Sequence, residues 1–290
     1  MATQKDFYHA DAEKKLKAIE SYLQRYLLVF KNQPSMETVY IDAFAGSGSM
    51  PAIPNDGLFK DQTDVDEFVL GSALRAVRLE QKFSRYIFIE EKKSKVDELK
   101  ERLSNENFGK SKVEFIKGNA NEELQKLCPY LSKGNVRAVV FLDPFGNQVG
   151  WDLLSVLGKT KHIDLWYLFP AMLGVYRQIG NSNAKMTSDQ VTSLKHIFGP
   201  NDWQSSFIKR EFNNDLFGPT ETQVKIADVE DITKFMIKCL NDIFEGRASN
   251  SWMPLGRNGA HWYSLIFAMA NPSKAATKIG HAMANHIMNA

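Results

Sequence analysis

The sequence predicts an α/β fold built on a doubly wound, mostly parallel sheet, and three observations support this prediction. Short apolar strands alternate with helical segments through the first 170 residues. A glycine-rich turn follows the first of these strands, as in nucleotide-binding α/β proteins. Much later, two strands flank Asn258-Gly259, a dipeptide typical of a type I′ hairpin turn.

The first half of the chain supplies five strands. An amphipathic helix is expected over residues 10–30, and Pro34 ends it. The predicted strands are 38–43, 85–90, 112–116, 136–142 and 163–169, and the helices between them are 65–82, 93–103, 121–128 and 151–160. Strands separated by helices favour a parallel sheet with right-handed crossovers.

The alternation stops after residue 170. Residues 171–248 carry helical patterns and no convincing strand, which predicts a helical insertion or lid. Strands return at 250–256 and 261–270, and Ser273 caps a last helix from residue 274 to about 288. We therefore expect four parts: an N-terminal helix (1–37), a cofactor-binding core (38–170), the insertion (171–248), and a hairpin with a helix that completes the core (249–290). Five parallel strands followed by an antiparallel hairpin is the seven-strand, Rossmann-like order of the class I methyltransferase fold.

Composition excludes several other classes of protein. A net charge of +2 does not by itself indicate a nucleic-acid-binding face. Two cysteines far apart in the sequence, without ligand spacing around them, argue against a zinc site or a disulfide framework, so we expect no metal. The polar N-terminus has no secretory signal, and the most apolar stretch, 163–176, is too short to span a bilayer. We expect a cytoplasmic protein without membrane association.

The strongest local signal is the loop from Asp42 to Gly48. Glycines at 46 and 48 let the backbone approach a ligand, and Asp42 can orient the loop and accept hydrogen bonds from an amine. A P-loop is excluded because Ser49-Met50 follows Gly48, and a dinucleotide fingerprint is excluded because Pro51 occupies the third glycine position. A site without pyrophosphate remains, and S-adenosylmethionine suits it.

Two further strand ends fit the same ligand. Glu90 ends the second strand, where a carboxylate would bind both ribose hydroxyls, and Asn119 follows the third strand, where its amide could pair with adenine. The alternative for Glu90 is a solvated acid beside Lys92 or Lys93. Three signals on successive strands favour the ligand. The predicted cofactor-binding residues are Asp42, Phe44, Ala45, Gly46, Ser47, Gly48, Glu90, Asn119, Ala120 and Asp143.

The fourth strand ends in a predicted catalytic turn, Asp143-Pro144-Phe145-Gly146. Asp143 could accept a hydrogen bond from a target amine, the Pro144 carbonyl could accept a second, and Phe145 offers a ring on which a base could stack. Methyl transfer needs little beyond alignment, so positioning would supply most of the rate. The alternative is a turn that merely ends a buried strand.

Outside these loops the candidate is Arg257, because the last hairpin turn would expose it near the end of the sheet, where it could bind an anionic substrate. The aromatic residues of the insertion alternate with Arg and Lys and could stack bases, but helical spacing favours an internal core for the insertion. On the first helix, Lys14, Lys15, Lys17 and Arg25 are expected on a solvated face opposite the apolar stripe.

The motifs resemble two families. The Asp-x-Phe-x-Gly-x-Gly run and the strand ending in Asp-Pro resemble adenine-N6 methyltransferases, whose fourth motif reads Asp/Asn-Pro-Pro-Tyr/Phe; here the aromatic Phe145 lies one position earlier. The closer resemblance is to the bacterial three-Cys-motif partner proteins (TcmP), and it covers nearly the whole chain. It lies in the leading helix (14–30) and in YIDAFAGSG (40–48), RYIFIE (85–90), FLDPFG (141–146), LWYLFP (165–170) and YSLIFAMANP (263–272).

The TcmP resemblance implies a methyltransferase-like fold and a companion protein that carries the three-cysteine motif. Two functions follow as hypotheses. The first is an S-adenosylmethionine-dependent methyltransferase acting on a nitrogen of an RNA or DNA base, with Asp143 orienting the acceptor. The second is a non-catalytic module that binds the cofactor and docks the companion protein.

Overall fold

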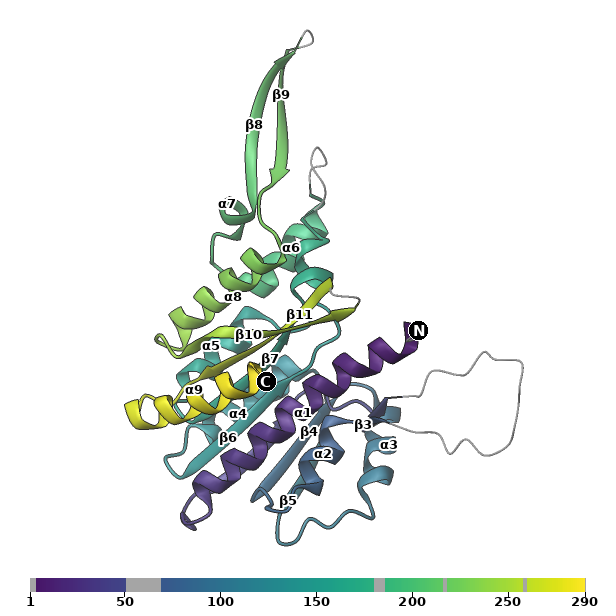
Figure 1. The fold of residues 1–290 in the computed structure, drawn as a ribbon, viewed down its shortest axis with the longest axis vertical. Coiled ribbons are helices and arrows are strands. Elements are labelled where there is room, and N and C mark those ends of the chain that lie inside the picture. Colours follow the sequence, from purple (N-terminus) through teal and green to yellow (C-terminus); the bar gives the residue numbers. More distant parts are fainter. Residues whose placement is uncertain (1–3, 51–68, 180–185, 216–217, 258–259, 290) are drawn as a thin grey trace, which may run out of the picture.

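The computed structural model describes residues 4–50, 69–179, 186–215, 218–257 and 260–289, and a seven-stranded sheet forms its centre (Figure 1). The strand order is β10-β11-β7-β6-β1-β4-β5. The strands are β1 (Glu37–Asp42), β4 (Arg85–Glu90), β5 (Lys112–Lys117), β6 (Val136–Leu142), β7 (Ile163–Phe169), β10 (Ala248–Arg257) and β11 (Ala260–Met269).

The directions of the strands agree with the predicted, mostly parallel sheet. β5, β4, β1, β6 and β7 pair in parallel, whereas β11 is antiparallel to both β7 and β10. The chain leaves β1 toward β4 on one side and later returns to place β6 on the other, so the strand order reverses at β1. This is the class I methyltransferase order, and the fold prediction is confirmed. The reversal puts a ligand crevice at the carboxyl ends of β1 and its neighbours.

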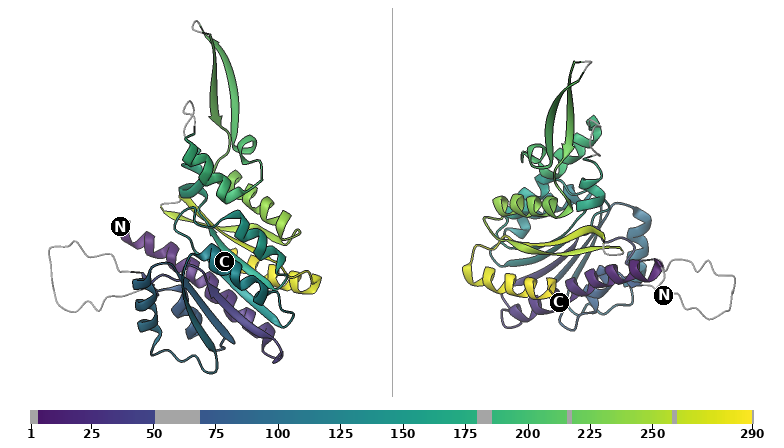
Figure 2. Two further views of the ribbon diagram at one scale, coloured as in Figure 1. Left: turned by 180° about the vertical axis from the view of Figure 1, so that it is seen from behind. Right: turned by 45° about the horizontal axis from the view of Figure 1, so that its top comes forward.

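Helices cover both faces of the sheet (Figure 2). Alternate residues of β1 explain this, because Val39 and Ile41 enter one apolar core and Tyr40 enters the other. The first core is covered by α4 (Ala120–Leu131), α5 (Trp151–Lys159) and α8 (Val229–Ile243). The second, rich in aromatic rings, is covered by α1 (Gln4–Phe30), α2 (Ser72–Arg78), α3 (Lys93–Leu103) and α9 (Lys274–Met288).

Helix α1 lies across the aromatic face and corrects one expectation. Its apolar stripe is buried as predicted, including Leu16, Ile19 and Leu23. Lys14 and Lys17 are exposed, but Lys15 is buried, with a relative exposure of 6%. The expectation that Lys15 lies on a solvated face is therefore wrong, and the reason is an ion pair described below.

The insertion contains more than the predicted helices. The π-helix η1 (Ala171–Tyr176), α6 (Ser188–Phe198) and α7 (Trp203–Phe207) are followed by a hairpin of β8 (Ile208–Asp215) and β9 (Gly218–Lys225). The prediction of a purely helical insertion is wrong at this hairpin. The hairpin projects away from the body (Figure 1), and its sequence lacks the alternation that marks a strand packed on a core.

Three aromatic residues of the insertion, Phe198, Trp203 and Phe207, are buried in an internal core, which is the interpretation that the sequence favoured. Phe198 and Phe207 are fully or almost fully buried, with ring centroids 5.6 Å apart in a T-shaped arrangement. Phe235 on α8 lies 5.0 Å from Phe207. These rings therefore join the insertion to the sheet-covering helix rather than forming a base-stacking surface.

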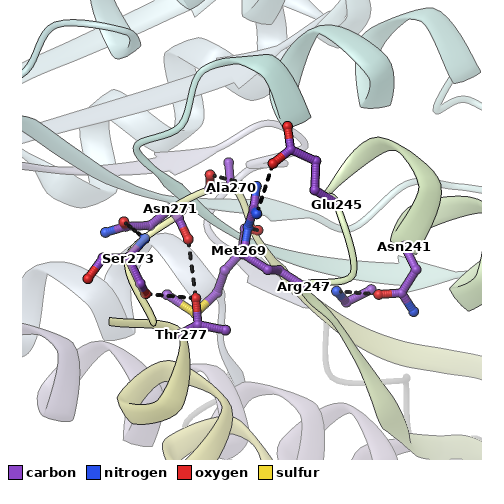
Figure 3. A network of polar contacts seen from close by, with 9 residues as sticks. Asn241, Glu245, Arg247, Met269, Ala270, Asn271, Ser273 and Thr277 are labelled. Atoms are coloured by element: carbon purple, nitrogen blue, oxygen red, sulfur yellow. Dashed lines mark hydrogen bonds and ion pairs between the residues drawn. The ribbon is translucent and has the colours of Figure 1, made fainter. Parts of the chain in front are cut away.

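A polar network joins the segment before β10 to the end of β11 and the start of α9 (Figure 3). Arg247 donates from Nε to the Met269 carbonyl at 3.2 Å and from Nη2 to the Ala270 carbonyl at 3.3 Å. Ser273 caps α9 as predicted, since its Oγ accepts from the Ala276 N–H. Thr277 Oγ1 donates to the Ser273 carbonyl at 2.9 Å, which closes the first turn of the helix.

Candidate functional site

Four neighbouring strands end along one edge of the sheet, and the predicted site residues lie there. Backbone bonds carry the pairing beyond the strands: Ala43 N–H donates to the Phe141 carbonyl at 3.1 Å, and Ala45 N–H donates to the Ile89 carbonyl at 3.0 Å. Gly118 N–H donates to the Glu90 carbonyl at 3.1 Å. The loops after β1, β4, β5 and β6 are therefore held in register.

Asp42 is an internal acid that organises the first loop. It is fully buried, and its Oδ1 accepts from the Phe44 N–H at 3.3 Å while its Oδ2 accepts from Ser72 Oγ at 2.5 Å. Burial raises the pKa of Asp42 to about 7; the bond from Ser72 lowers it, the charge of Asp143 raises it, and the charge of Lys15 lowers it. Asp42 therefore orients the loop from beneath, as predicted.

The two glycines of this loop differ in their surroundings. Gly46 (φ +61°) and Gly48 (φ +83°) both adopt the left-handed conformation that favours glycine. A methyl group on Gly46 would meet nothing within 4 Å, whereas one on Gly48 would lie 2.7 Å from Cδ1 of Leu99. Gly46 therefore presents backbone to open space, and Gly48 lets the loop pack against α3. Between them Ser47 is half-buried, while Ala45 is buried.

The end of the loop is anchored on α2. The short strands β2 (Ser49–Met50) and β3 (Val69–Leu70) pair with one another, and Gly71 N–H donates to the Gly48 carbonyl at 3.0 Å. Residues 51–68, which include the start of the predicted helix 65–82, lie outside the described residues.

Glu90 and Asn119 have local partners. Glu90 is partly exposed, and its Oε1 accepts from the Lys92 N–H at 2.9 Å, just before α3 begins. Asn119 is exposed and caps α4, with its Oδ1 accepting from the Asn121 N–H at 2.9 Å, and Ala120 is buried behind it. Because the cap occupies the amide oxygen of Asn119, only its NH2 group is left to recognise an adenine.

The turn after β6 places its three predicted catalytic residues in different environments. Oδ2 of Asp143 accepts a hydrogen bond from Lys15 Nζ at 2.5 Å, and Pro144 is buried. Phe145 is 76% exposed, its N–H donates to Gln148 Oε1 at 2.8 Å, and Lys95 Nζ lies 5.3 Å from its ring centroid. The turn therefore holds an anchored carboxylate beside an accessible aromatic ring.

Lys15 and Ser72 are the site residues that the sequence reasoning missed. A lysine is rarely buried, so its charge suggested a solvated position. One signal was nevertheless available, because Lys15 precedes buried Ala18 and Ile19 by three and four residues and so belongs to the buried stripe. Ser72 carried no signal, because it falls inside the predicted helix 65–82, whereas the observed helix α2 begins at Ser72.

Two hollows in the described part of the chain are not lined by residues 42–48 or by Asp143, although the lining of the first includes Asn121, whose N–H donates to Asn119. One of about 180 Å³ lies where α5 begins, against the end of α6, and is lined by residues that include Gly150, Trp151 and His196. The other, of about 50 Å³, lies between α1 and α9 near Asp164.

Neither cysteine is a candidate nucleophile. Burial raises the pKa of the Cys128 thiol to about 11 and that of Cys239 to about 12, so neither ionises readily. The described residues contain no group of three side chains suited to a metal ion. No described helix combines the length and apolarity that a membrane span requires.

Together, the seven-strand order and the acid-bearing loops at its switch point define a protein with the class I methyltransferase fold. No protein-family model matches the sequence, and no curated protein matches it. Among solved structures, protein LPL1258 from Legionella pneumophila is 11% identical with a TM-score of 0.40, covering 80% of this chain and 93% of its own. The N-terminal domain of EvdMO1 with SAH bound is 12% identical with a TM-score of 0.36, covering 86% of this chain and 80% of its own.

Proposed function

We propose that this protein is an S-adenosylmethionine-dependent methyltransferase that methylates a nitrogen atom of a nucleic-acid base. The observation that carries the proposal is the juxtaposition of two loops: the glycine loop after β1 and the Asp143 turn after β6 leave neighbouring strands at the same edge. Donor and acceptor sites beside one another are what a direct group transfer requires.

The residues of the first loop fit the adenosyl amino acid. The backbone at Gly46 is open to a ligand. Residues 42–48 contain no lysine that could bind a triphosphate. Glu90, at the end of the neighbouring strand β4, offers a carboxylate for the ribose hydroxyls. When bound, S-adenosylmethionine supplies a methyl group on a sulfonium sulfur. The protein holds this edge through Asp42, which fixes the backbone at Phe44.

The acceptor side is supplied by the Asp143 turn. A carboxylate oxygen of Asp143 accepts a hydrogen bond from the target amine, which orients the nitrogen lone pair and stabilises the positive charge that develops on the nitrogen. The N–C bond would form as the C–S bond breaks, S-adenosylhomocysteine would leave, and the nitrogen would then lose a proton to solvent. The base stacks on the exposed ring of Phe145. The ammonium group of Lys95, which lies by this ring, attracts the phosphate of the same nucleotide. A base in a single strand or a loop meets this geometry, because its face and its amine are both accessible.

Two measurements test the proposal. Calorimetric titration with S-adenosylhomocysteine reports whether the protein binds the cofactor product, and tritiated-methyl incorporation into RNA, DNA and cell lysate reports transfer. Asp143→Ala, which removes the acceptor oxygens, should reduce incorporation by at least about 100-fold while S-adenosylhomocysteine affinity stays within about tenfold. Asp97→Ala, at an exposed acid on α3, is the matched control and should leave both unchanged. Full incorporation by Asp143→Ala would contradict the assigned role.

A second function is supported by a different observation, the projecting β8–β9 hairpin. In the described part of the chain the two strands pair only with one another, so each has an outer edge available to another chain. Together with the sequence resemblance to three-Cys-motif partner proteins, this favours docking of a companion protein that carries the three-cysteine motif. Replacing residues 210–223 with a short Gly-Ser linker should abolish co-purification of such a companion and leave S-adenosylhomocysteine binding intact. Cofactor binding without incorporation, even with the companion present, would favour this docking function over catalysis.

A further inference from the structure

Lys15 makes a contact that a lysine on a helix surface does not normally make. It lies on α1, its side chain is only 8% exposed, and its Nζ lies 2.5 Å from Oδ2 of Asp143, which is 23% exposed and 128 residues away in the chain. Burying an ammonium group is costly unless a partner compensates it. The contact therefore determines where both side chains lie.

The backbone that carries Lys15 is itself held in place. Arg75 on α2 binds Glu20 at 3.0 Å and also binds Glu13, so a salt bridge is made on each side of Lys15 along α1. The same helix α2 begins at Ser72, which binds Asp42. The two acids at the edge of the sheet are thus braced by adjoining helices, and their charges influence one another.

We propose that Lys15 is a positioning residue of the methyl-transfer site: its ammonium group holds Oδ2 of Asp143 and leaves Oδ1 as the oxygen that receives the acceptor amine. This inference rests on the proposed function. Holding one oxygen restricts Asp143 to a single orientation, and the positive charge offsets the repulsion between Asp143 and Asp42. An ion-paired ammonium has no free lone pair, so Lys15 is not itself an acceptor of the methyl group.

The test uses the intact chain and five variants. Lys15→Met removes the charge but keeps the length, Lys15→Arg keeps the charge, and Lys14→Met is the matched control at an exposed position of the same helix. Asp143→Ala, alone and combined with Lys15→Met, completes a double-mutant cycle. Each variant is measured for kcat, for S-adenosylhomocysteine affinity and for the acceptor KM.

We expect Lys15→Met to lower kcat by at least about tenfold with S-adenosylhomocysteine affinity within about threefold. Lys15→Arg should restore part of the loss, and Lys14→Met should match the wild type. In the Asp143→Ala background, Lys15→Met should cause no further loss, because the two residues act through one contact. An equal loss in both backgrounds, a parallel loss of cofactor affinity, or a methylated Lys15 in the mass spectrum would overturn the proposal.

A readout independent of turnover separates this inference from the proposed function. If the wild type transfers no methyl group to any acceptor, the proposed function fails, and carboxyl ¹³C NMR of Asp42 decides the role of Lys15. Because the charge of Lys15 lowers the pKa of Asp42, the titration midpoint of Asp42 should lie higher in Lys15→Met than in Lys14→Met. Equal midpoints would overturn the inference even if the enzyme is active.

Discussion

The ammonium nitrogen of Lys15 lies 2.5 Å from Oδ2 of Asp143, and this pair joins the N-terminal helix to the loop after β6. Sequence order alone assigns residues 1–37 to a part separate from the core. The ion pair, together with the bonds from Arg75 to Glu13 and Glu20, makes α1 a structural component of the candidate site. The candidate site is therefore assembled from α1 and α2 as well as from the loops at the carboxyl ends of the strands.

The first prediction concerns the stability of this pair. Asp143→Ala leaves the buried ammonium of Lys15 without its partner, so the free energy of unfolding should fall by about 1–3 kcal/mol, less than for a fully buried pair because Asp143 is partly exposed. The double variant Lys15→Met/Asp143→Ala should lose less than the sum of the two single variants. Urea unfolding at pH 7.5 gives the free energy of unfolding of each protein in this double-mutant cycle. If the loss in the double variant equalled the sum of the two single losses, the two side chains would not interact.

The second prediction compares two glycines with the same backbone conformation. Gly46 (φ +61°) and Gly109 (φ +60°) both have nothing within 4 Å of an added methyl group. Ala at either position should cost about 1 kcal/mol of stability from the left-handed backbone. Only Gly46→Ala should lower S-adenosylhomocysteine affinity, because only that methyl group would enter the cofactor's path. Equal affinities of the two variants would remove Gly46 from the site.

The third prediction is the pH dependence of cofactor binding. Burial raises the pKa of Asp42 to about 7, so this carboxyl group passes from mostly neutral to mostly ionised between pH 6 and 8. The ionised form is the better acceptor for the Phe44 N–H and for Ser72. S-adenosylhomocysteine affinity should therefore rise by about three- to tenfold from pH 6 to pH 8, and Asp42→Asn should flatten this dependence. Calorimetric titration at the two pH values measures the affinity of each protein. The same change of affinity with pH in the wild type and in Asp42→Asn would contradict the prediction.

The fourth prediction concerns Asp164 under α1. Burial raises its pKa to about 7, and Tyr22 Oη donates to its Oδ2 at 2.6 Å. Because the folded state holds this proton more tightly than the unfolded state, the free energy of unfolding should fall as the pH rises from about 4 to about 7. Asp164→Asn keeps an acceptor for Tyr22 but has no proton to lose. Between pH 5 and 7.5 the free energy of unfolding of Asp164→Asn should fall by about 2 kcal/mol less than that of the wild type. The same fall in both proteins would exclude Asp164 as the cause.

The sequence predicted the sheet and the edge on which the candidate site lies, because periodicity and strand-end residues are local signals. It predicted β4, β6 and β7 at the bounds observed, and it placed Asp42, Glu90, Asn119 and Asp143 on neighbouring loops. It missed the β8–β9 hairpin, whose sequence lacks the alternation of a strand packed on a core. It also missed Lys15, because a contact across 128 residues depends on where a whole helix packs, which no local pattern encodes.

The central claim is that the edge formed by the loops after β1, β4 and β5 binds an adenosyl amino acid. The most direct test is calorimetric titration of the purified, folded protein with S-adenosylhomocysteine at pH 8, with Gly46→Ala and Gly109→Ala titrated alongside. We predict one site per chain with a Kd below about 0.1 mM, weakened in Gly46→Ala and unchanged in Gly109→Ala. No binding to the folded wild-type protein at about 1 mM ligand, or equal binding by all three proteins, would contradict the claim.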